Sequence, residues 1–214
     1  MYHTFVLTSL EPQERHYLGL IRAHARVGQM DASDPRKAEA INQQVKKIYD
    51  QNKSMKPTTS MYSACISAYG GSKEYKSTSK VMELFEELKA IYGKTNDAVF
   101  QPDSMLCSAV IDAILRATQK NSTSLHHAIE LLDKMKHSHD MGEADKGPNR
   151  YAYTNLLVKI TTTMMENGSK LAEELIQQMD SCSRLLNDES ICPDTQAYTS
   201  LIQKNCQRQA VFLP

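Results

Sequence analysis

Hydrophobic residues along the chain recur at helical spacing, in pairs of segments that polar stretches separate. In the segment 61–69, the positions that share one helical face are Met61, Cys65, Ile66 and Tyr69. In the segment 81–88, they follow the spacing i, i+3, i+4, i+7: Val81, Leu84, Phe85 and Leu88. Both patterns are typical of amphipathic α-helices with one buried face. This region therefore predicts a helix, a polar turn at 70–77 and a second helix.

The same pair of segments is found along the rest of the chain. A first helix of this kind is expected at 152–160, with Ala152, Leu156, Leu157 and Ile160 on one face. Second helices are expected at 38–48, 125–135 and 171–179, and further polar turns at 118–124 and 166–169. No run shows the period of two that a strand requires. We therefore expect an all-α fold of helix-turn-helix units.

Prolines mark the start of each unit. They stand at Pro12, Pro57, Pro102, Pro148 and Pro193, at intervals of 45, 45, 46 and 45 residues. Five positions after each proline come Tyr17, Tyr62, Cys107, Tyr153 and Tyr198. A fixed period of about 20 to 50 residues indicates a stacked-repeat architecture. We expect a lead-in at 1–11, an array at 12–206 whose fifth unit is incomplete, and a tail at 207–214, as in a segment of a longer array.

The residue after each proline has a local role. The proline disfavours helical backbone in the residue before it. The residue after it is Gln13, Thr58, Asp103, Asn149 or Asp194, and four of these five are good N-cap types. Four of the five units are therefore predicted to start their first helix with a side-chain cap.

Composition limits the possible functions. Lysine plus arginine balance aspartate plus glutamate at 25 each, which argues against attachment to nucleic acid by bulk positive charge. No apolar run approaches the roughly 18 residues of a membrane helix, and no signal or transit peptide is recognisable. The five cysteines include no CxxC pair, which indicates a reducing compartment without disulfides. Of these, Cys65, Cys107 and Cys206 are expected as small buried residues.

Catalytic and metal-binding motifs are not apparent. The stretch 136–147, expected as an inserted loop, gathers possible ligands such as His137, His139 and Asp140, but without the paired spacing of a metal site on a rigid element. His126 and His127 are expected at the surface, and His24 in packing. The sequence contains no phosphate-binding glycine loop, nucleophile elbow or HExxH motif. We expect no enzyme activity, no cofactor and no small-molecule substrate.

The recurring phrase resembles the pentatricopeptide repeat. Proline, Asp or Asn, three residues, tyrosine and a hydroxyl residue open the fourth and fifth units, and the other units keep part of this phrase. Second helices such as "MELFEELK" and "AEELIQQMD" complete the unit. The likeness covers residues 12 to about 206. It implies a right-handed α-solenoid of stacked helix-turn-helix repeats. The unit here is 45 residues rather than the family's typical 35, and the extra residues fall in loops, where insertions cost little closure entropy.

The resemblance also implies binding of single-stranded RNA, with about one base read per repeat. The family reads a base with the residue after the tyrosine position and the residue after the next proline. Carried over, the base-reading candidates are Ser63 with Asp103, Ser108 with Asn149, and Thr154 with Asp194, while Thr199 opens an incomplete pair. Leu18 with Thr58 matches no pairing. An ionised Asp side chain only accepts hydrogen bonds, which suits the N–H donors of guanine. An Asn side chain both donates and accepts, which suits adenine.

The resemblance implies that further side chains pack against the two faces of each base. They stand at the second residue after the capping position. The candidates here are Arg15, Met105 and Tyr151, while Ser60 and Gln196 are poor platforms. The resemblance thus implies an RNA-binding protein of RNA processing, stability or translation in a mitochondrion or plastid. The alternatives are a protein-protein interaction scaffold of the same fold, or the RNA-binding arm of a nuclease whose catalytic domain lies outside these residues.

Overall fold

A computed structural model gives the fold of residues 12–30, 35–72, 77–117, 122–140, 147–163, 167–186 and 188–211. This part of the chain is helical and contains no strand. Its first helices, one after each proline, are α1 (Glu14–Met30), α3 (Thr59–Gly71), α5 (Ser104–Ala117), α7 (Arg150–Thr162) and α9 (Thr195–Val211). Its second helices are α2 (Arg36–Asn52), α4 (Ser77–Thr95), α6 (Ser122–Asp140) and α8 (Gly168–Leu186).

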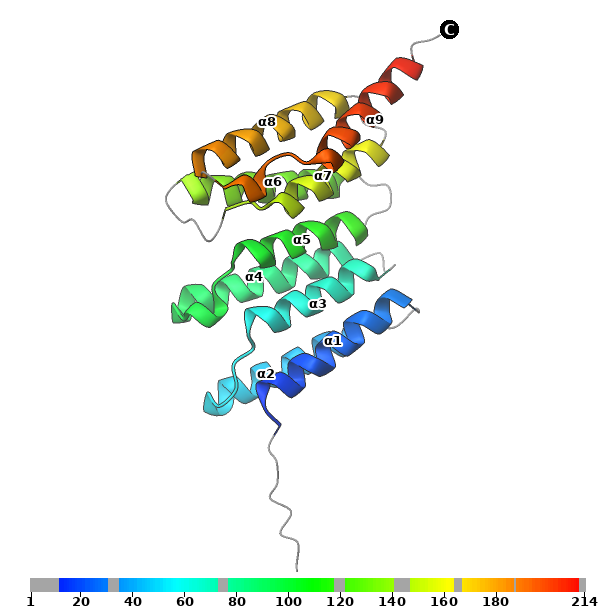
Figure 1. Ribbon diagram of the computed structural model, residues 1–214. Coiled ribbons are helices and arrows are strands. Elements are labelled where there is room, and N and C mark those ends of the chain that lie inside the picture. The colour runs from blue at the N-terminus through cyan, green and yellow to red at the C-terminus, as the bar shows by residue number, and fades with distance from the viewer. Residues whose placement is uncertain are drawn as a thin grey trace, which may run out of the picture.

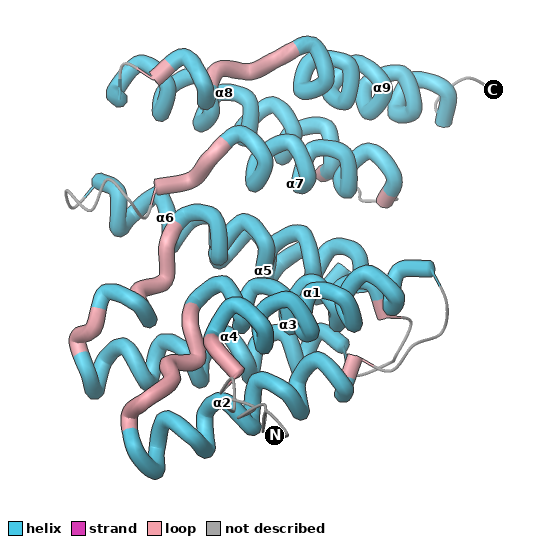
Figure 2. The backbone as a smooth tube through the Cα atoms, turned by 60° about the horizontal axis from the view of Figure 1, so that its bottom comes forward, coloured by secondary structure: helices cyan, strands magenta, loops and turns pink. Residues whose placement is uncertain are grey.

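Each helix packs against its neighbours in the chain. The first helices contact one another in order, from α1 through α3, α5 and α7 to α9, as Figure 1 shows from bottom to top. Each second helix packs on the first helix of its own unit and on the next first helix. The tube view shows the same order from a different direction (Figure 2). The predicted all-α fold of paired helices is confirmed.

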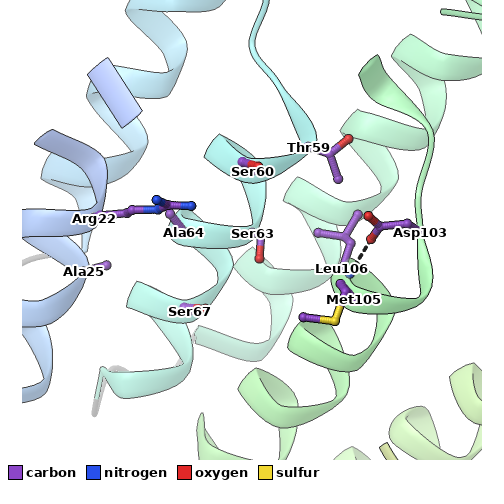
Figure 3. A pocket seen from close by; sticks show the side chains of 10 residues that line it. All are labelled: Arg22, Ala25, Thr59, Ser60, Ser63, Ala64, Ser67, Asp103, Met105 and Leu106. Carbon is purple, nitrogen blue, oxygen red and sulfur yellow. Dashed lines mark hydrogen bonds between the residues drawn. The ribbon is translucent and has the colours of Figure 1, made fainter. Parts of the chain in front are cut away.

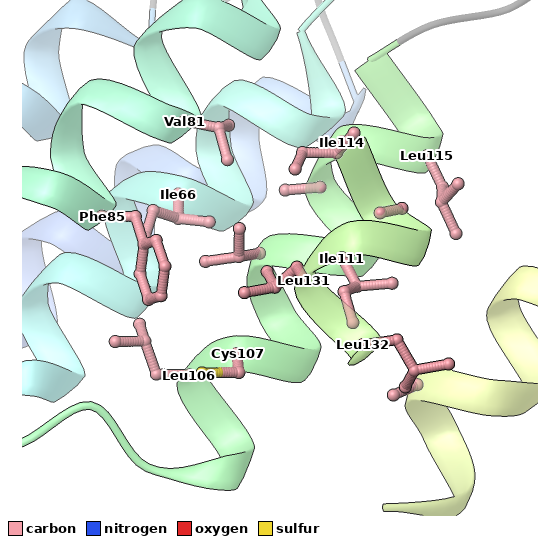
Figure 4. Close-up of a cluster of buried hydrophobic side chains, with 14 of the residues drawn as sticks. Ile66, Val81, Phe85, Leu106, Cys107, Ile111, Ile114, Leu115, Leu131 and Leu132 are labelled. Carbon is pink, nitrogen blue, oxygen red and sulfur yellow. The ribbon is translucent and has the colours of Figure 1, made fainter. Parts of the chain in front are cut away.

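The apolar stripes predicted from spacing form the core. All four apolar residues of the stripe at 61–69 are almost completely buried, as are those at 81–88 and 152–160. Figure 4 shows how α3, α4, α5 and α6 share one cluster: Ile66, Val81, Phe85, Cys107, Ile111 and Leu131 lie together. Burial of apolar area contributes about 25 cal/mol per Å². Most of that area is formed between helices rather than within one.

Polar groups tie the second helices of the first two units together beneath α3. Glu39 of α2 lies 3.6 Å from Lys80 of α4, and Lys46 of α2 pairs with Glu87 of α4. The hydroxyl of Tyr69 donates to Glu39. Burial, and then the charge of Glu87, raise the pKa of Tyr62 far above its usual range, so its phenol stays protonated. These two ion pairs link α2 with α4.

Short 3-10 turns precede two of the first helices and were not predicted. They are η1 (Ala98–Phe100) and η3 (Glu189–Ile191). Asp97 caps η1 by accepting from the Val99 amide at 3.1 Å, and Asp188 caps η3 by accepting from the Ser190 amide at 2.8 Å. The repeated phrases "NDAVFQPD" and "NDESICPD" carry this signal in the sequence.

The structure corrects the predicted loop at 136–147. Helix α6 continues through the first residues of that stretch to Asp140, and these residues include no proline or glycine that would end a helix. The rest of the stretch, 141–146, lies outside the described residues. Within the described residues no group of three His, Cys, Asp or Glu side chains is placed to hold a metal ion. The expectation that His126 and His127 are at the surface is confirmed.

The cysteines follow the prediction in part. All five are free thiols, and Cys65 and Cys107 are buried as expected. Burial raises the pKa of the Cys65 thiol to about 12. Cys206 was expected to be buried and is exposed, because no second helix covers that side of α9 within the described chain. Cys182 is buried in α8 although no spacing argument indicated it.

One stretch, Ala98–Arg116, is long and apolar enough for a membrane helix by length and composition, with a mean hydropathy of 1.3. The sequence pattern had led us to expect none. Half of this stretch is buried inside the structure, and most of it is the core helix α5, packed between α3 and α7. A core helix meets the same criterion as a membrane span.

A close approach between the first helices α3 and α5 sets our first prediction. A Cβ atom at Gly70 of α3 would lie 2.5 Å from the Cα atom of Ala113 in α5. Gly70→Ala should therefore destabilise the protein by about 1–3 kcal/mol, because the two backbones must separate. Urea unfolding measures the effect.

The matched control for this change is Gly93→Ala in α4, where the added Cβ meets nothing within 4 Å. Alanine is the better helix former, so this variant should gain up to about 1 kcal/mol. Equal effects of the two substitutions would show that α3 and α5 are not in this close contact.

Candidate functional site

A cavity of about 440 Å³ opens between α1, α3 and the start of α5. Three elements that are far apart in the sequence supply its walls (Figure 3). The residues that line it are Arg22, Ala25, Thr59, Ser60, Ser63, Ala64, Ser67, Asp103, Met105 and Leu106. Three predicted RNA-contacting residues, Ser63, Asp103 and Met105, are thus brought together.

Asp103 occupies one side of the cavity and also caps α5. Its Oδ1 atom accepts from the Leu106 amide at 2.7 Å, which satisfies one of the free amides at the helix start. Within the described part of the chain its Oδ2 atom has no hydrogen-bond partner. The residue is exposed. One carboxylate can therefore cap the helix and present an acceptor to the cavity at the same time.

Ser63, Met105 and Arg22 complete the cavity's chemistry. Ser63 lies half-buried on α3 between Arg22 and Asp103, which stand on opposite sides (Figure 3). Met105 is 69% exposed, so its flexible thioether is free to pack against a flat ligand. Arg22 of α1 supplies the cation. The cavity thus offers a hydroxyl, a carboxylate acceptor, an apolar surface and a guanidinium.

Among the polar residues of the cavity, sequence reasoning missed Arg22, Thr59 and Ser67. Ser60, Ser63 and Ser67 stand at spacing i, i+3, i+7 and so form a stripe of hydroxyls along one side of α3. This spacing is the sequence signal that could have indicated Ser67. The sequence carries no such signal for Arg22, because the position of Arg22 beside α3 depends on how α1 packs.

The corresponding hydroxyl residues of the next two units are buried. Ser108 is 7% exposed, and its Oγ atom donates to the Ser104 carbonyl at 2.7 Å. Thr154 is 8% exposed, and its Oγ1 atom is buried without a hydrogen-bond partner among the described residues. The cavity reaches neither of them. Ser63 is therefore placed differently from its two counterparts.

Longer side chains fill the space between α5 and α7. Where α3 has Ala64 and Ala68, α7 has Asn155 and Lys159. The Asn155 amide donates to Asp112 at 3.4 Å, and the Lys159 ammonium donates to the Leu115 carbonyl at 2.8 Å. Burial lowers the pKa of Lys159.

The other predicted residues start helices or lie on the surface. Asn149 caps α7 by accepting from the Ala152 amide at 3.1 Å, and Asp194 accepts from the Ala197 amide at 2.9 Å. Thr199 is exposed and donates to the Thr195 carbonyl at 2.7 Å. The predicted side-chain caps are confirmed at Asp103, Asn149 and Asp194, whereas Thr58 caps α3 without a side-chain hydrogen bond.

The three base-flanking candidates all reach solvent. Tyr151 is 71% exposed at the start of α7, and Arg15 is exposed in the first turn of α1. Together with Met105 they occupy one equivalent position in three units. Each is therefore accessible to a ligand that lies along the starts of the first helices.

A second cavity, of about 280 Å³, lies on the second helices between α4 and α6. Its lining is more apolar and includes Met82, Phe85, Tyr92, Leu131 and Met135. Two ion pairs lie at its rim, each within one helix. Lys89 lies 2.9 Å from Glu86 in α4, and Lys134 lies 2.8 Å from Glu130 in α6.

Comparison of the chain with protein-family models, with curated proteins and with solved structures found no match.

The side-chain cap at Asn149 generates a stability prediction. Asn149→Ala should cost about 1 kcal/mol of unfolding free energy, because a free amide of α7 loses its acceptor. Asn149→Asp should stay within a few tenths of the wild type, since Asp caps equally well. Urea unfolding compares the two variants, and an equal loss in both would show that the side chain does not act as a cap.

Proposed function

We propose that this protein binds single-stranded RNA on the face formed by its first helices, with about one base held per repeat. In this proposal, the helix pairs form a right-handed α-solenoid of the pentatricopeptide type. It acts as a binding module without a catalytic step of its own. Its proposed place is in RNA processing, stability or translation in a mitochondrion or plastid, which rests on the resemblance alone.

The observation that carries the proposal is the cavity between α1, α3 and α5. Two positions that the resemblance pairs across a repeat boundary, Ser63 and Asp103, line one space of about 440 Å³ together with Met105. They are 40 residues apart in the sequence, so their meeting depends on how the repeats stack.

The chemistry of the cavity suits a purine nucleotide. The Oδ2 atom of Asp103 can accept from the N–H groups of a guanine edge, and the Ser63 hydroxyl can donate or accept beside it. Met105 can cover the base face. Arg22 can pair with a backbone phosphate, as guanidinium groups do in nucleic-acid recognition. The neutral net charge implies that such local contacts, rather than bulk attraction, hold the RNA.

A second candidate function is a protein-interaction scaffold of the same fold. The apolar cavity between α4 and α6 favours it, because apolar and aromatic side chains such as Phe85 and Tyr92 are typical of protein-binding grooves. This cavity lies on the second helices, so the two functions use different faces.

Base preference tests the Asp103 assignment. Selection from random single-stranded RNA, followed by sequencing, should show a position that prefers guanine in the wild type. Asp103→Asn should shift that position toward adenine, because the amide adds a donor while the cap on α5 is kept. No binding even at low salt would exclude the proposal.

The matched control is Asp188→Asn. Asp188 is also a helix cap: it accepts from the Ser190 amide of the short helix η3 at 2.8 Å. Unlike Asp103, it lies outside the cavity. Its substitution should leave every base preference unchanged. If Asp103→Asn behaves in the same way, Asp103 does not read a base.

The salt dependence of RNA affinity tests Arg22. Arg22→Gln should weaken binding and reduce the slope of log K against log salt by about 0.7, the value for one phosphate contact on a single strand. Arg184→Gln, on the exposed surface of α8 next to Asp180, should change neither quantity. A slope that is unchanged in Arg22→Gln would remove Arg22 from the interface.

A further inference from the structure

The fourth unit carries the same kind of residue pair as the cavity, at the same register. Thr154 and Asp194 stand six and one positions after a proline, as Ser63 and Asp103 do. Asp194 caps α9 through its Oδ1 atom, just as Asp103 caps α5. Thr154, however, is only 8% exposed, whereas Ser63 is half-buried and lines the cavity. The two pairs therefore share their chemistry but differ in access.

Two side chains of α7 account for this difference. The Lys159 ammonium donates to the Leu115 carbonyl of α5 at 2.8 Å, and the Asn155 amide donates to Asp112 of α5 at 3.4 Å. Both side chains thus cross from α7 to α5 beside Thr154. The second unit has alanine at the two equivalent positions, seven and eleven residues after its proline: Ala64, which lines the cavity, and Ala68.

The charge that faces each space differs as well. Arg22 of α1 stands ten positions after Pro12, and the residue at that register on α5 is Asp112. The Oδ2 atom of Asp112 lies 2.7 Å from Arg116, so these two charges cancel locally. Arg22 is exposed at the cavity and forms no ion pair within the described part of the chain. A phosphate therefore meets an unpaired guanidinium at the cavity but a neutralised one at the fourth unit.

The Thr154 hydroxyl remains available for a ligand. Its Oγ1 atom is buried and has no hydrogen-bond partner among the described residues, whereas the Ser108 hydroxyl already donates to the Ser104 carbonyl. A buried polar atom without a partner is destabilising, so this hydroxyl would gain from a hydrogen-bonding group that reached it. Access is the property that the fourth unit lacks.

We infer that Asn155 and Lys159 are specificity-determining residues, which close the Thr154–Asp194 position to a base and make the RNA-binding face skip the fourth unit. The inference rests on the proposed RNA binding, and it limits base reading to units whose interface leaves space. A base at the fourth unit would have to break the two contacts of α7 with α5, and this loss offsets the bonds it could form.

Opening the interface tests this inference by gain of function. The open variant, Asn155→Ala with Lys159→Ala, gives α7 the two alanines that α3 has. Selection from random single-stranded RNA should give one guanine-preferring position for the wild type and a second for the open variant, with one nucleotide between them for the intervening unit. Asp194→Asn should shift the second position toward adenine in the open variant and shift nothing in the otherwise wild-type chain.

Access to residue 154 is measured without RNA. Thr154→Cys is modified with N-ethylmaleimide, and mass spectrometry locates the product at that residue. The reaction should be at least about tenfold faster in the open variant than in the otherwise wild-type chain, because a buried thiol reacts poorly. Urea unfolding should show a cooperative transition in the open variant. Asn155→Ala alone, which removes the weaker contact, should act in the same direction and replaces the double change if that change prevents folding.

The matched control is Gln43→Ala with Lys47→Ala in α2. This pair also consists of an amide and an ammonium four residues apart, and the Gln43 amide likewise donates across to a neighbouring helix, at 3.5 Å to Glu87 of α4. It lies outside the cavity and away from Thr154. Its substitution should change neither the modification rate at residue 154 nor any base preference.

Three results would overturn the inference. One is a base preference in the otherwise wild-type chain that Asp194→Asn shifts, and another is a modification rate that the open variant does not raise. The third is a raised rate without a second guanine position. Each leaves the proposed function intact, because the wild type still selects guanine at the Asp103 position. Absence of RNA binding by the wild type would instead exclude the proposed function, and the inference with it.

Discussion

The structure depends on one constraint: each internal first helix is apolar around most of its circumference, so it is stable only between other helices. In α3 the buried residues are Met61, Tyr62, Ala64, Cys65, Ile66, Ala68, Tyr69 and Gly70. The part of the α3 surface that is not buried is a narrow polar strip, which includes Ser60, Ser63 and Ser67. Neighbouring units must therefore cover α3 on both sides, and only that strip can contact a ligand. The stacking that forms the core thus also determines where a binding site can lie.

The sequence was sufficient for the α-helices and their order. Proline spacing located every first helix, and apolar spacing located every second helix, because both signals are local and occur several times. Local signals failed where tertiary context decides. Nothing in the spacing around Gly70 indicates that Ala113 approaches it from another helix. Cys206 follows the same pattern as buried positions, yet its exposure depends on whether a second helix covers α9.

The candidate site was predictable only in part, for a similar reason. The repeat register indicated that Ser63 and Asp103 lie near each other, and both line the cavity, since register fixes which residues lie at adjacent repeat edges. It could not distinguish Ser63 from Thr154, which occupies the same register position and is buried. The difference comes from the neighbouring helix interface: α3 has Ala64 and Ala68 there, whereas α7 has Asn155 and Lys159, which bond back to α5. Accessibility is therefore a property of the interface and not of the repeat motif.

Helix capping and base reading are compatible in one residue because a carboxylate has two oxygens. At Asp103 the Oδ1 atom accepts from the Leu106 amide, which fixes the side chain and removes the entropic cost of ordering it on binding. The Oδ2 atom of a carboxylate is an acceptor only. An Asp in this position therefore presents an oriented acceptor before any ligand arrives. Asn149 has the same arrangement at α7, with its amide nitrogen in place of Oδ2, so the two caps would present opposite hydrogen-bonding groups to a base.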